Sequence, residues 1–223
     1  MSPAAIIKKA KSVGLDIIGI CDHNSTLNAQ LTYELGKQEG LYVLLGAEVT
    51  SKEDVHSLCF MPTIEKLCEF QIFLDAHQTF FPNSPSDFGN QFVVDKDENI
   101  IDEIPYLLIN ALNLSINQLS EKVYQLGGMF IPAHVDRNLY SLSSQLGIVP
   151  DNLDFNVLEL SPYAYRNKFF EKFPWFADYS YITNSDAHFI SDIGKSYNLL
   201  NLKKIDFFNI KEALRLAITK FPE

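Results

Sequence analysis

Four of the five histidines in this sequence fall in short clusters of residue types that bind metal ions. In chain order the clusters are Asp22-His23-Asn24, Glu48 with His56, Pro132-Ala133-His134, and Ser185-Asp186-Ala187-His188. Neutral imidazole and carboxylate are ligands that suit Zn, Mn or Fe, and several such groups together can hold two or more ions. Two ions that clamp a phosphate and activate a water molecule are a common route to phosphoester hydrolysis. The histidine pattern therefore predicts a metal site with hydrolytic chemistry.

Each cluster taken alone also has an ordinary structural interpretation. An Asp-His pair such as Asp22-His23 is more often a capped turn than a metal site, and a single histidine such as His134 is more often structural. Their coincidence favours a metal site, because three clusters follow an apolar run and only His77 lies outside the set. His56 differs from the others, since it opens its apolar run instead of closing it. We interpret His77 as a structural or surface residue.

Apolar runs and helical patterns alternate along most of the chain, which is typical of a parallel α/β sheet or barrel. We expect strands or buried apolar runs at residues 16–21, 41–49, 55–61, 129–133, 155–160, 179–183 and 197–202. We expect helices at about residues 2–13, 25–40, 64–76, 115–127 and 209–221, the fourth opening with a capping box from Ser115 to Gln118. In α/β barrels the carboxyl ends of the strands meet on one face. That arrangement would bring the histidine clusters together.

Residues 80–113 interrupt this alternation and predict a hairpin insertion. They contain Pro82 and Pro85, an apolar run at 92–94, a polar turn at 95–99 and a second apolar run at 100–101. A lid over a site and an excursion without function are both open interpretations, because long insertions cost little loop entropy. The acidic residues of the turn lack the spacing of an EF-hand, so we interpret it as a solvated turn.

The composition limits the classes of protein to consider. A chain of 223 residues with 47% hydrophobic content can bury the core of one domain, which we place over residues 1–223. Its formal net charge of −10 disfavours nucleic acid as a partner and favours a small phosphorylated substrate. No apolar stretch reaches the roughly 18 residues of a membrane span, and no secretory signal is present, so we expect no membrane partner and a cytoplasmic location. Cys21, Cys59 and Cys68 lie in apolar runs without a CxxC pair, and we expect them to be structural.

Five segments of the chain carry a resemblance to a known enzyme family. They are Gly14-Leu15-Asp16-Ile17-Ile18-Gly19-Ile20-Cys21-Asp22-His23-Asn24, Gly46-Ala47-Glu48-Val49-Thr50, Val55-His56-Ser57-Leu58-Cys59-Phe60, Ile131-Pro132-Ala133-His134-Val135-Asp136-Arg137 and Asn184-Ser185-Asp186-Ala187-His188. In this order and spacing they resemble the PHP family, the polymerase and histidinol phosphatase metal-dependent phosphoesterases. The resemblance implies a distorted seven-stranded TIM-like (β/α)7 barrel. It also implies hydrolysis of phosphomonoesters or nucleotide phosphates by a metal-activated water.

The resemblance implies ligand roles as well. Six residues would bind one to three divalent ions of Zn, Mn or Fe: His23, Glu48, His56, His134, Asp186 and His188. Glu48 would bridge two positions, and His56 and His134 would complete one of them. The other three ligands would serve a second and a third position.

Two further residues are expected to act in catalysis, Asp22 and Arg137. Asp22 would orient its neighbouring metal-bound histidine, as carboxylates beside such histidines often do. Arg137 and Arg166 are candidates for binding a phosphate, since guanidinium matches its geometry, and solvated surface arginines are the equal alternative.

The sequence lacks the His-x-His segment with which the family opens, because it starts at the helix that follows this segment. The expected barrel is therefore missing its first strand and both ligands of one metal position. Three explanations are open: the true start lies upstream of Met1, another chain supplies the segment, or the chain is a remnant without turnover. The position formed by Glu48, His56 and His134 is independent of the missing segment. We therefore expect metal binding with weak or absent phosphatase activity.

The function that these observations favour is a metal-dependent phosphoesterase acting on phosphate esters. Two alternatives stay open: a non-catalytic metal-binding or assembly module with the same fold, and a nuclease that trims oligonucleotides. The hydrolase differs from the binding module because only the hydrolase releases phosphate when Mn or Zn is added. The acidic composition disfavours the nuclease.

Overall fold

A four-stranded sheet forms the centre of the computed structural model, which describes residues 1–164 and 168–216. Its strands, in the order in which they pair, are β1 (Ile17–His23), β2 (Tyr42–Thr50), β3 (His56–Met61) and β6 (Met129–Pro132). β1 runs parallel to β2, whereas β3 is antiparallel to both β2 and β6. The expected α/β class is confirmed, but this sheet is mixed where we expected parallel strands.

The direction of β3 follows from the short link that precedes it. Only residues 51–55 separate β2 from β3, and they form a tight turn in which the Ser51 N–H donates to the Val55 carbonyl at 3.0 Å. A parallel crossover needs about a dozen residues or more, so this link can only join antiparallel neighbours. As a result Thr50, at the end of β2, pairs with His56, at the start of β3. His56 thus lies at the same end of the sheet as the residues that close β1 and β2.

A separate two-stranded sheet beside β6 consists of two short strands that pair in parallel, β7 (Leu158–Glu159) and β8 (Tyr181–Ile182). The Asn156 N–H donates to the Phe130 carbonyl, and the Val135 N–H donates to the Glu159 carbonyl, so the chain around β7 follows β6. No closed barrel is found among residues 1–164 and 168–216. The expected seven-stranded barrel is therefore not confirmed, and the described strands form open sheets.

The strand expected at residues 197–202 was wrong. In its place the side-chain amide of Asn198 pairs with the backbone of Thr183, accepting from its N–H at 3.0 Å and donating to its carbonyl at 3.1 Å. The Asn198 side chain thus satisfies the backbone N–H and carbonyl of Thr183, which a neighbouring strand would otherwise do. The next residue, Leu199, is 90% exposed and does not continue the core.

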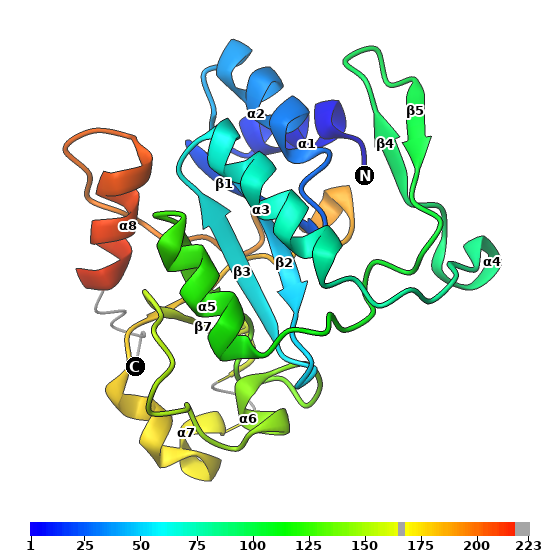
Figure 1. The fold of residues 1–223 in the computed structure, drawn as a ribbon. Helices are drawn as coiled ribbons and strands as arrows, with labels where there is room; N and C mark the ends of the chain where they lie inside the picture. The colour runs from blue at the N-terminus through cyan, green and yellow to red at the C-terminus, as the bar shows by residue number, and fades with distance from the viewer. Residues whose placement is uncertain (165–167, 217–223) are drawn as a thin grey trace.

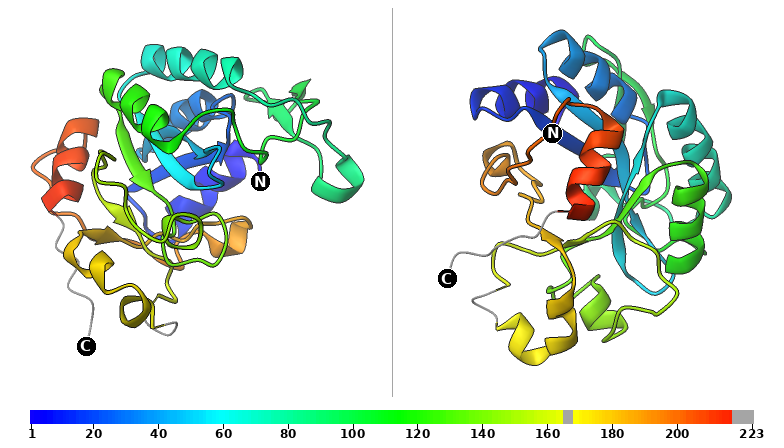
Figure 2. Two further views of the ribbon diagram at one scale, coloured as in Figure 1. Left: turned by 60° about the horizontal axis from the view of Figure 1, so that its bottom comes forward. Right: turned by 90° about the vertical axis from the view of Figure 1, so that its left-hand side faces the viewer.

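Helices cover both faces of the central sheet. The helices on one face are α1 (Pro3–Ser12), α2 (Ala29–Gln38), α3 (Ile64–Ala76) and α5 (Ile116–Gln125), and α3 and α5 lie over β2 and β3 in Figure 1. The predicted capping box of α5 is confirmed, with Ser115 and Gln118 bonded reciprocally. The final helix, α8 (Phe207–Leu216), lies on the opposite face (Figure 2), and the rest of the helix expected at 209–221 lies outside the described residues. No helix in the described part of the chain is long and apolar enough to span a bilayer.

The face of the sheet beneath α8, here called the α8 face, is divided into an apolar end and a polar end. Phe207, Ile210 and Leu214 of α8 pack there with the strand residues Leu44 and Phe60. Because alternate strand residues share a face, the side chain four positions after Leu44 and the one four positions before Phe60 also lie on the α8 face. Those two residues are Glu48 and His56. The fold therefore places an acid and a histidine side by side beyond the apolar packing of α8.

The segment expected as an insertion projects from the body of the molecule (Figure 1). It contains α4 (Pro85–Phe88) and an antiparallel hairpin of β4 (Phe92–Val94) and β5 (Ile100–Glu103). The side chain of Asn28 holds the hairpin to the body through the Phe92 carbonyl at 3.0 Å and the Val94 N–H at 3.2 Å. The remaining short helices are α6 (Leu142–Gln145), α7 (Phe169–Lys172), η1 (Pro174–Asp178) and η2 (Ile190–Asp192).

Candidate metal centre

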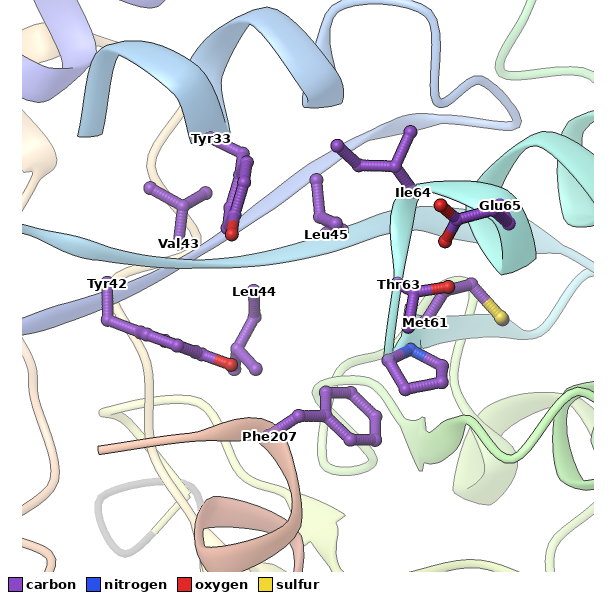
Figure 3. A pocket seen from close by; sticks show the side chains of 11 residues that line it. Tyr33, Tyr42, Val43, Leu44, Leu45, Met61, Thr63, Ile64, Glu65 and Phe207 are labelled. Carbon is purple, nitrogen blue, oxygen red and sulfur yellow. The ribbon is translucent and has the colours of Figure 1, made fainter. Parts of the chain in front are cut away.

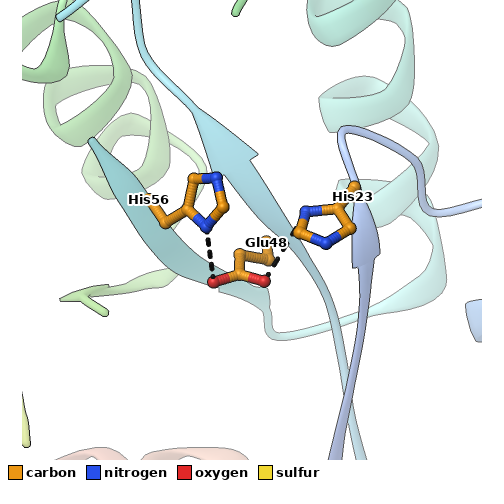
Figure 4. A group of neighbouring side chains, drawn as sticks. All are labelled: His23, Glu48 and His56. Carbon is orange, nitrogen blue, oxygen red and sulfur yellow. Dashed lines mark ion pairs between the residues drawn. The ribbon is translucent and has the colours of Figure 1, made fainter. Parts of the chain in front are cut away.

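The carboxylate of Glu48 lies among three histidines at the polar end of the α8 face. Its Oε1 atom is 3.2 Å from Nδ1 of His56 and 3.2 Å from Nε2 of His134, and its Oε2 atom is 3.6 Å from Nδ1 of His23. Figure 4 shows His23 and His56 pointing toward this carboxylate from β1 and β3. Glu48, His56 and His134 are buried. Four candidate ligands of two types, one carboxylate and three imidazoles, thus converge from four separate segments.

The separations within this cluster fit a bound divalent ion. Around a tetrahedral ion with bonds of about 2.0–2.1 Å, neighbouring ligand atoms lie roughly 3.3 Å apart. The two contacts of 3.2 Å at Glu48 match that spacing. In addition, Nδ1 of His23 is buried without a hydrogen-bond partner in the described chain, so no hydrogen bond competes with coordination at this atom. The residues present therefore suit a transition metal.

The charges of the cluster also suit metal binding. Burial by itself would raise the pKa of Glu48, but the hydrogen bonds from His134 and His56 and the nearby histidines hold it well below its ordinary value. Burial lowers the pKa of His23. Burial would also lower the pKa of His134, but the contact with Glu48 raises it overall. At neutral pH the acid is ionised and His23 is neutral, which are the forms that bind metals, whereas the raised pKa of His134 means that metal binding there competes with a proton.

Backbone conformation at the cluster is unusual. His134 has φ 30° and Asn24 has φ 47°, in the left-handed region that non-glycine residues rarely adopt. Asn24 is held there because its N–H donates to the Glu48 carbonyl at 2.9 Å and its side chain accepts from the Thr50 N–H at 2.9 Å. Its amide also donates to the carbonyls of Leu108 and Asn110, which ties the end of the projecting segment to the ends of β1 and β2.

A second group of predicted site residues lies beside the first. Asp186 forms an ion pair with Arg137, and its Oδ1 atom is 3.8 Å from Nδ1 of His188. The ring of His188 is 6.2 Å from that of His23, centroid to centroid, and its side chain is 58% exposed. The structure therefore brings all six predicted metal ligands and Arg137 to one end of the sheet, with the Asp186 group on the solvent side.

Asp22, which we expected to act beside His23, is not brought to this cluster. Successive strand residues point to opposite faces, so its side chain leaves β1 away from His23. Burial raises the pKa of Asp22, and a hydrogen bond with Asn28 opposes the rise. Asp22 therefore contacts the residue that anchors the projecting hairpin. Arg166 lies outside the described residues, and His77 packs on Phe73, away from the site.

Two residues at the site were not predicted from the sequence. Glu159, buried in β7, accepts hydrogen bonds from the His134 N–H at 3.0 Å and from the Asn184 amide at 2.7 Å. An acid inside the apolar run 155–160 is the sequence signal for it. Tyr140 stacks its ring on that of His56, with centroids 4.6 Å apart, and its backbone carbonyl accepts from the backbone N–H of His56 at 3.0 Å. No sequence pattern indicates Tyr140.

A pocket of about 260 Å³ lies at the other end of β2, away from the histidines. Figure 3 shows Tyr33, Tyr42 and Phe207 around it. It borders the apolar packing of α8 and contains none of the predicted ligands. We assign it no part in the metal centre.

Comparison with known proteins gives one curated relative and several similar folds. No family model matches the chain. It is 26% identical over 234 residues to the uncharacterized protein YqxK of Bacillus subtilis, a match that covers 94% of this chain and 54% of the relative. The chain thus spans about half the length of that curated relative.

The similar solved structures include a lesion-specific endonuclease, a metal-dependent phosphoesterase and an amidohydrolase, by their descriptions. The lesion-specific endonuclease Q of Pyrococcus furiosus matches with a TM-score of 0.66 and 24% identity, over 96% of this chain and 51% of the other. Endonuclease Q bound to a 27-mer duplex with an abasic lesion matches with a TM-score of 0.67 and 22% identity, over 98% and 53%. A protein of Bifidobacterium adolescentis described as a metal-dependent phosphoesterase matches with a TM-score of 0.56 and 18% identity, over 98% and 92%. At these identities the comparisons establish a shared fold and nothing further about activity.

Proposed function

We propose that this chain is a metal-dependent hydrolase of phosphate esters. The observation that carries the proposal is the buried Glu48 carboxylate with three histidine nitrogens 3.2–3.6 Å away. The shared fold supports it, because one similar structure is described as a metal-dependent phosphoesterase and two as endonuclease Q. When bound, divalent ions of Zn, Mn or Fe would polarise a phosphoryl group and lower the pKa of a water molecule.

The residues of the site would divide the work. Glu48, His56 and His134 would hold one ion in the buried part of the cluster. Asp186 and His188 would hold an ion nearer to solvent, where a small phosphorylated substrate can approach. The buried residues would thus fix the position of one ion, and the more exposed residues would leave room for the substrate.

The test of the proposal is phosphate release from p-nitrophenyl phosphate and from a nucleoside monophosphate. We expect weak release that increases when Mn²⁺ or Zn²⁺ is added, and that disappears in Asp186→Asn. If wild type released no more phosphate than Asp186→Asn, for both substrates and both metals, hydrolysis would be contradicted. The chain would then be a metal-binding module.

Arg137 is expected to bind the phosphate of the substrate. Its guanidinium already lies at Asp186, and its side chain is 43% exposed, so it can reach a ligand at the mouth of the site. Hydrogen bonds between charged groups contribute about 1.5–3 kcal/mol, so Arg137→Gln should raise KM roughly 10- to 100-fold. Arg215→Gln is the control, since Arg215 is an exposed arginine of α8 paired with Glu212. An unchanged KM in Arg137→Gln would make Arg137 a surface residue.

A nuclease is the second candidate, favoured by the likeness to endonuclease Q bound to a duplex with an abasic lesion. The net charge of −10 opposes it, because binding to the phosphate backbone relies on clustered positive charge. Incubation with labelled duplex and single-stranded oligonucleotides, with and without an abasic site, separates the two. Metal-dependent shortening of an oligonucleotide without release from monophosphates would favour the nuclease.

A further inference from the structure

Glu159 occupies a position between the metal centre and the apolar packing of α8. It lies two residues after Val157 on the α8 face and is only 3% exposed. Its Oε2 atom accepts from the backbone N–H of His134 at 3.0 Å, and its Oε1 atom accepts from the amide of Asn184 at 2.7 Å. Asn184 in turn accepts from the amide of Asn198 at 2.9 Å. The carboxylate is therefore fixed at both oxygen atoms.

The contact with His134 bears on a residue whose backbone is strained. His134 has φ 30°, a conformation that persists only where the surroundings impose it. The neighbouring residues are held as well, since the Ala133 N–H donates to the His56 carbonyl and the Val135 N–H donates to the Glu159 carbonyl. Together these bonds fix the backbone on both sides of His134. This conformation is the one in which its Nε2 atom lies 3.2 Å from Glu48.

Packing alone does not account for an acid at this point. Burying a carboxylate is costly even when its hydrogen bonds are satisfied, and an apolar residue at such a position usually gives equal or greater stability. The flanking residues of the run, Leu158 and Leu160, are fully buried and apolar. What Glu159 adds is an acceptor aimed at the His134 N–H.

We propose that Glu159 is a positioning residue that fixes the backbone of His134, so that the imidazole faces Glu48 and the cluster binds its metal tightly. Asn184 orients Glu159 for this role. The inference rests on the proposed metal centre, and it concerns metal affinity without requiring turnover. Removing a residue that hydrogen-bonds to a metal ligand typically weakens metal binding about 10- to 100-fold.

The test compares Glu159→Gln with Asp136→Asn in the full chain. Asp136 is a matched control, because it is also a buried carboxylate that accepts a backbone hydrogen bond, from the Ser161 N–H at 2.6 Å, and it does not contact the cluster. Titration with Co²⁺ alone gives the Kd, and the visible absorption of bound Co²⁺ reports its coordination geometry. Thermal unfolding in chelator gives the stability of each variant without metal.

We expect Glu159→Gln to weaken Co²⁺ binding about 10- to 100-fold and to change the Co²⁺ spectrum, without lowering the unfolding temperature in chelator. Asp136→Asn should keep the Kd within about twofold and the wild-type spectrum. Asn184→Ala, a second variant that leaves the carboxylate in place, should weaken binding in the same direction. A wild-type Kd and spectrum in both Glu159→Gln and Asn184→Ala would overturn the inference. It would also be overturned if Co²⁺ affinity fell in all three variants in proportion to their loss of stability. A wild-type chain that binds no Co²⁺ would overturn the metal centre itself, and the inference with it.

Discussion

Glu48→Gln is expected to remove metal binding by this chain, with a loss of affinity of more than about 100-fold. Mutating a residue that only hydrogen-bonds to a metal ligand already changes metal affinity about 10- to 100-fold. Glu48 would be a ligand itself, and it contacts His23, His56 and His134 directly. Glutamine preserves the size of the side chain but replaces a charged oxygen with an amide. The loss therefore arises from chemistry at the centre and not from a cavity.

The measurement is metal content by plasma mass spectrometry on protein purified without chelator. Wild-type protein should carry at least one equivalent of transition metal, and Glu48→Gln should carry none. Glu53→Gln is the matched control, because Glu53 is a half-buried acid that accepts from the Ile116 N–H at 3.0 Å and lies outside the cluster. Equal metal in Glu48→Gln and wild type would place the metal elsewhere in the chain.

The residues of the candidate site could be selected from the sequence because the histidines are few and clustered. Sequence reasoning placed Glu48 and His134 at the ends of strands, and the structure has them there. His56 was difficult to interpret, since it opens its apolar run. The link of residues 51–55 contains the answer, because it is too short for a parallel crossover and makes β3 return antiparallel. The length of this loop thus already indicated an antiparallel β3, although the barrel resemblance led us to expect parallel strands.

Other features depend on contacts that local patterns do not reveal. The role of Glu159 depends on the N–H of His134 and on Asn184, both far away in sequence. The apolar run at 197–202 predicted a strand, but the side chain of Asn198 pairs with Thr183 instead. Asp22 is different, because strand alternation already implies that it faces away from His23. The role that the resemblance implied for Asp22 therefore disagrees with the alternation of side chains along β1.

The pH dependence of stability is the second large expected effect, and it arises at Glu159. Burial raises the pKa of Glu159 from its ordinary 4.5 to about 7. Between these values the folded chain binds a proton that the unfolded chain has lost, so the stability from this group is complete below pH 4.5 and falls as pH rises toward 7. The difference corresponds to about 3 kcal/mol, since each pH unit is worth roughly 1.4 kcal/mol. Metal-free wild type should lose this stability, and Glu159→Gln should not.

Urea unfolding in chelator gives the free energy of unfolding of both proteins at several values between about pH 4.5 and pH 8. The effect is the change with pH in the difference between these two free energies. The other titrating groups are present in both proteins, so the change isolates residue 159. Glu159→Gln should gain about 3 kcal/mol relative to wild type across this range, and parallel curves would contradict a proton held by Glu159. A gain in stability together with weaker metal binding would mean that the acid is kept for the geometry of His134 at a cost to the fold. That trade is expected where a site needs a strained backbone and a buried charge.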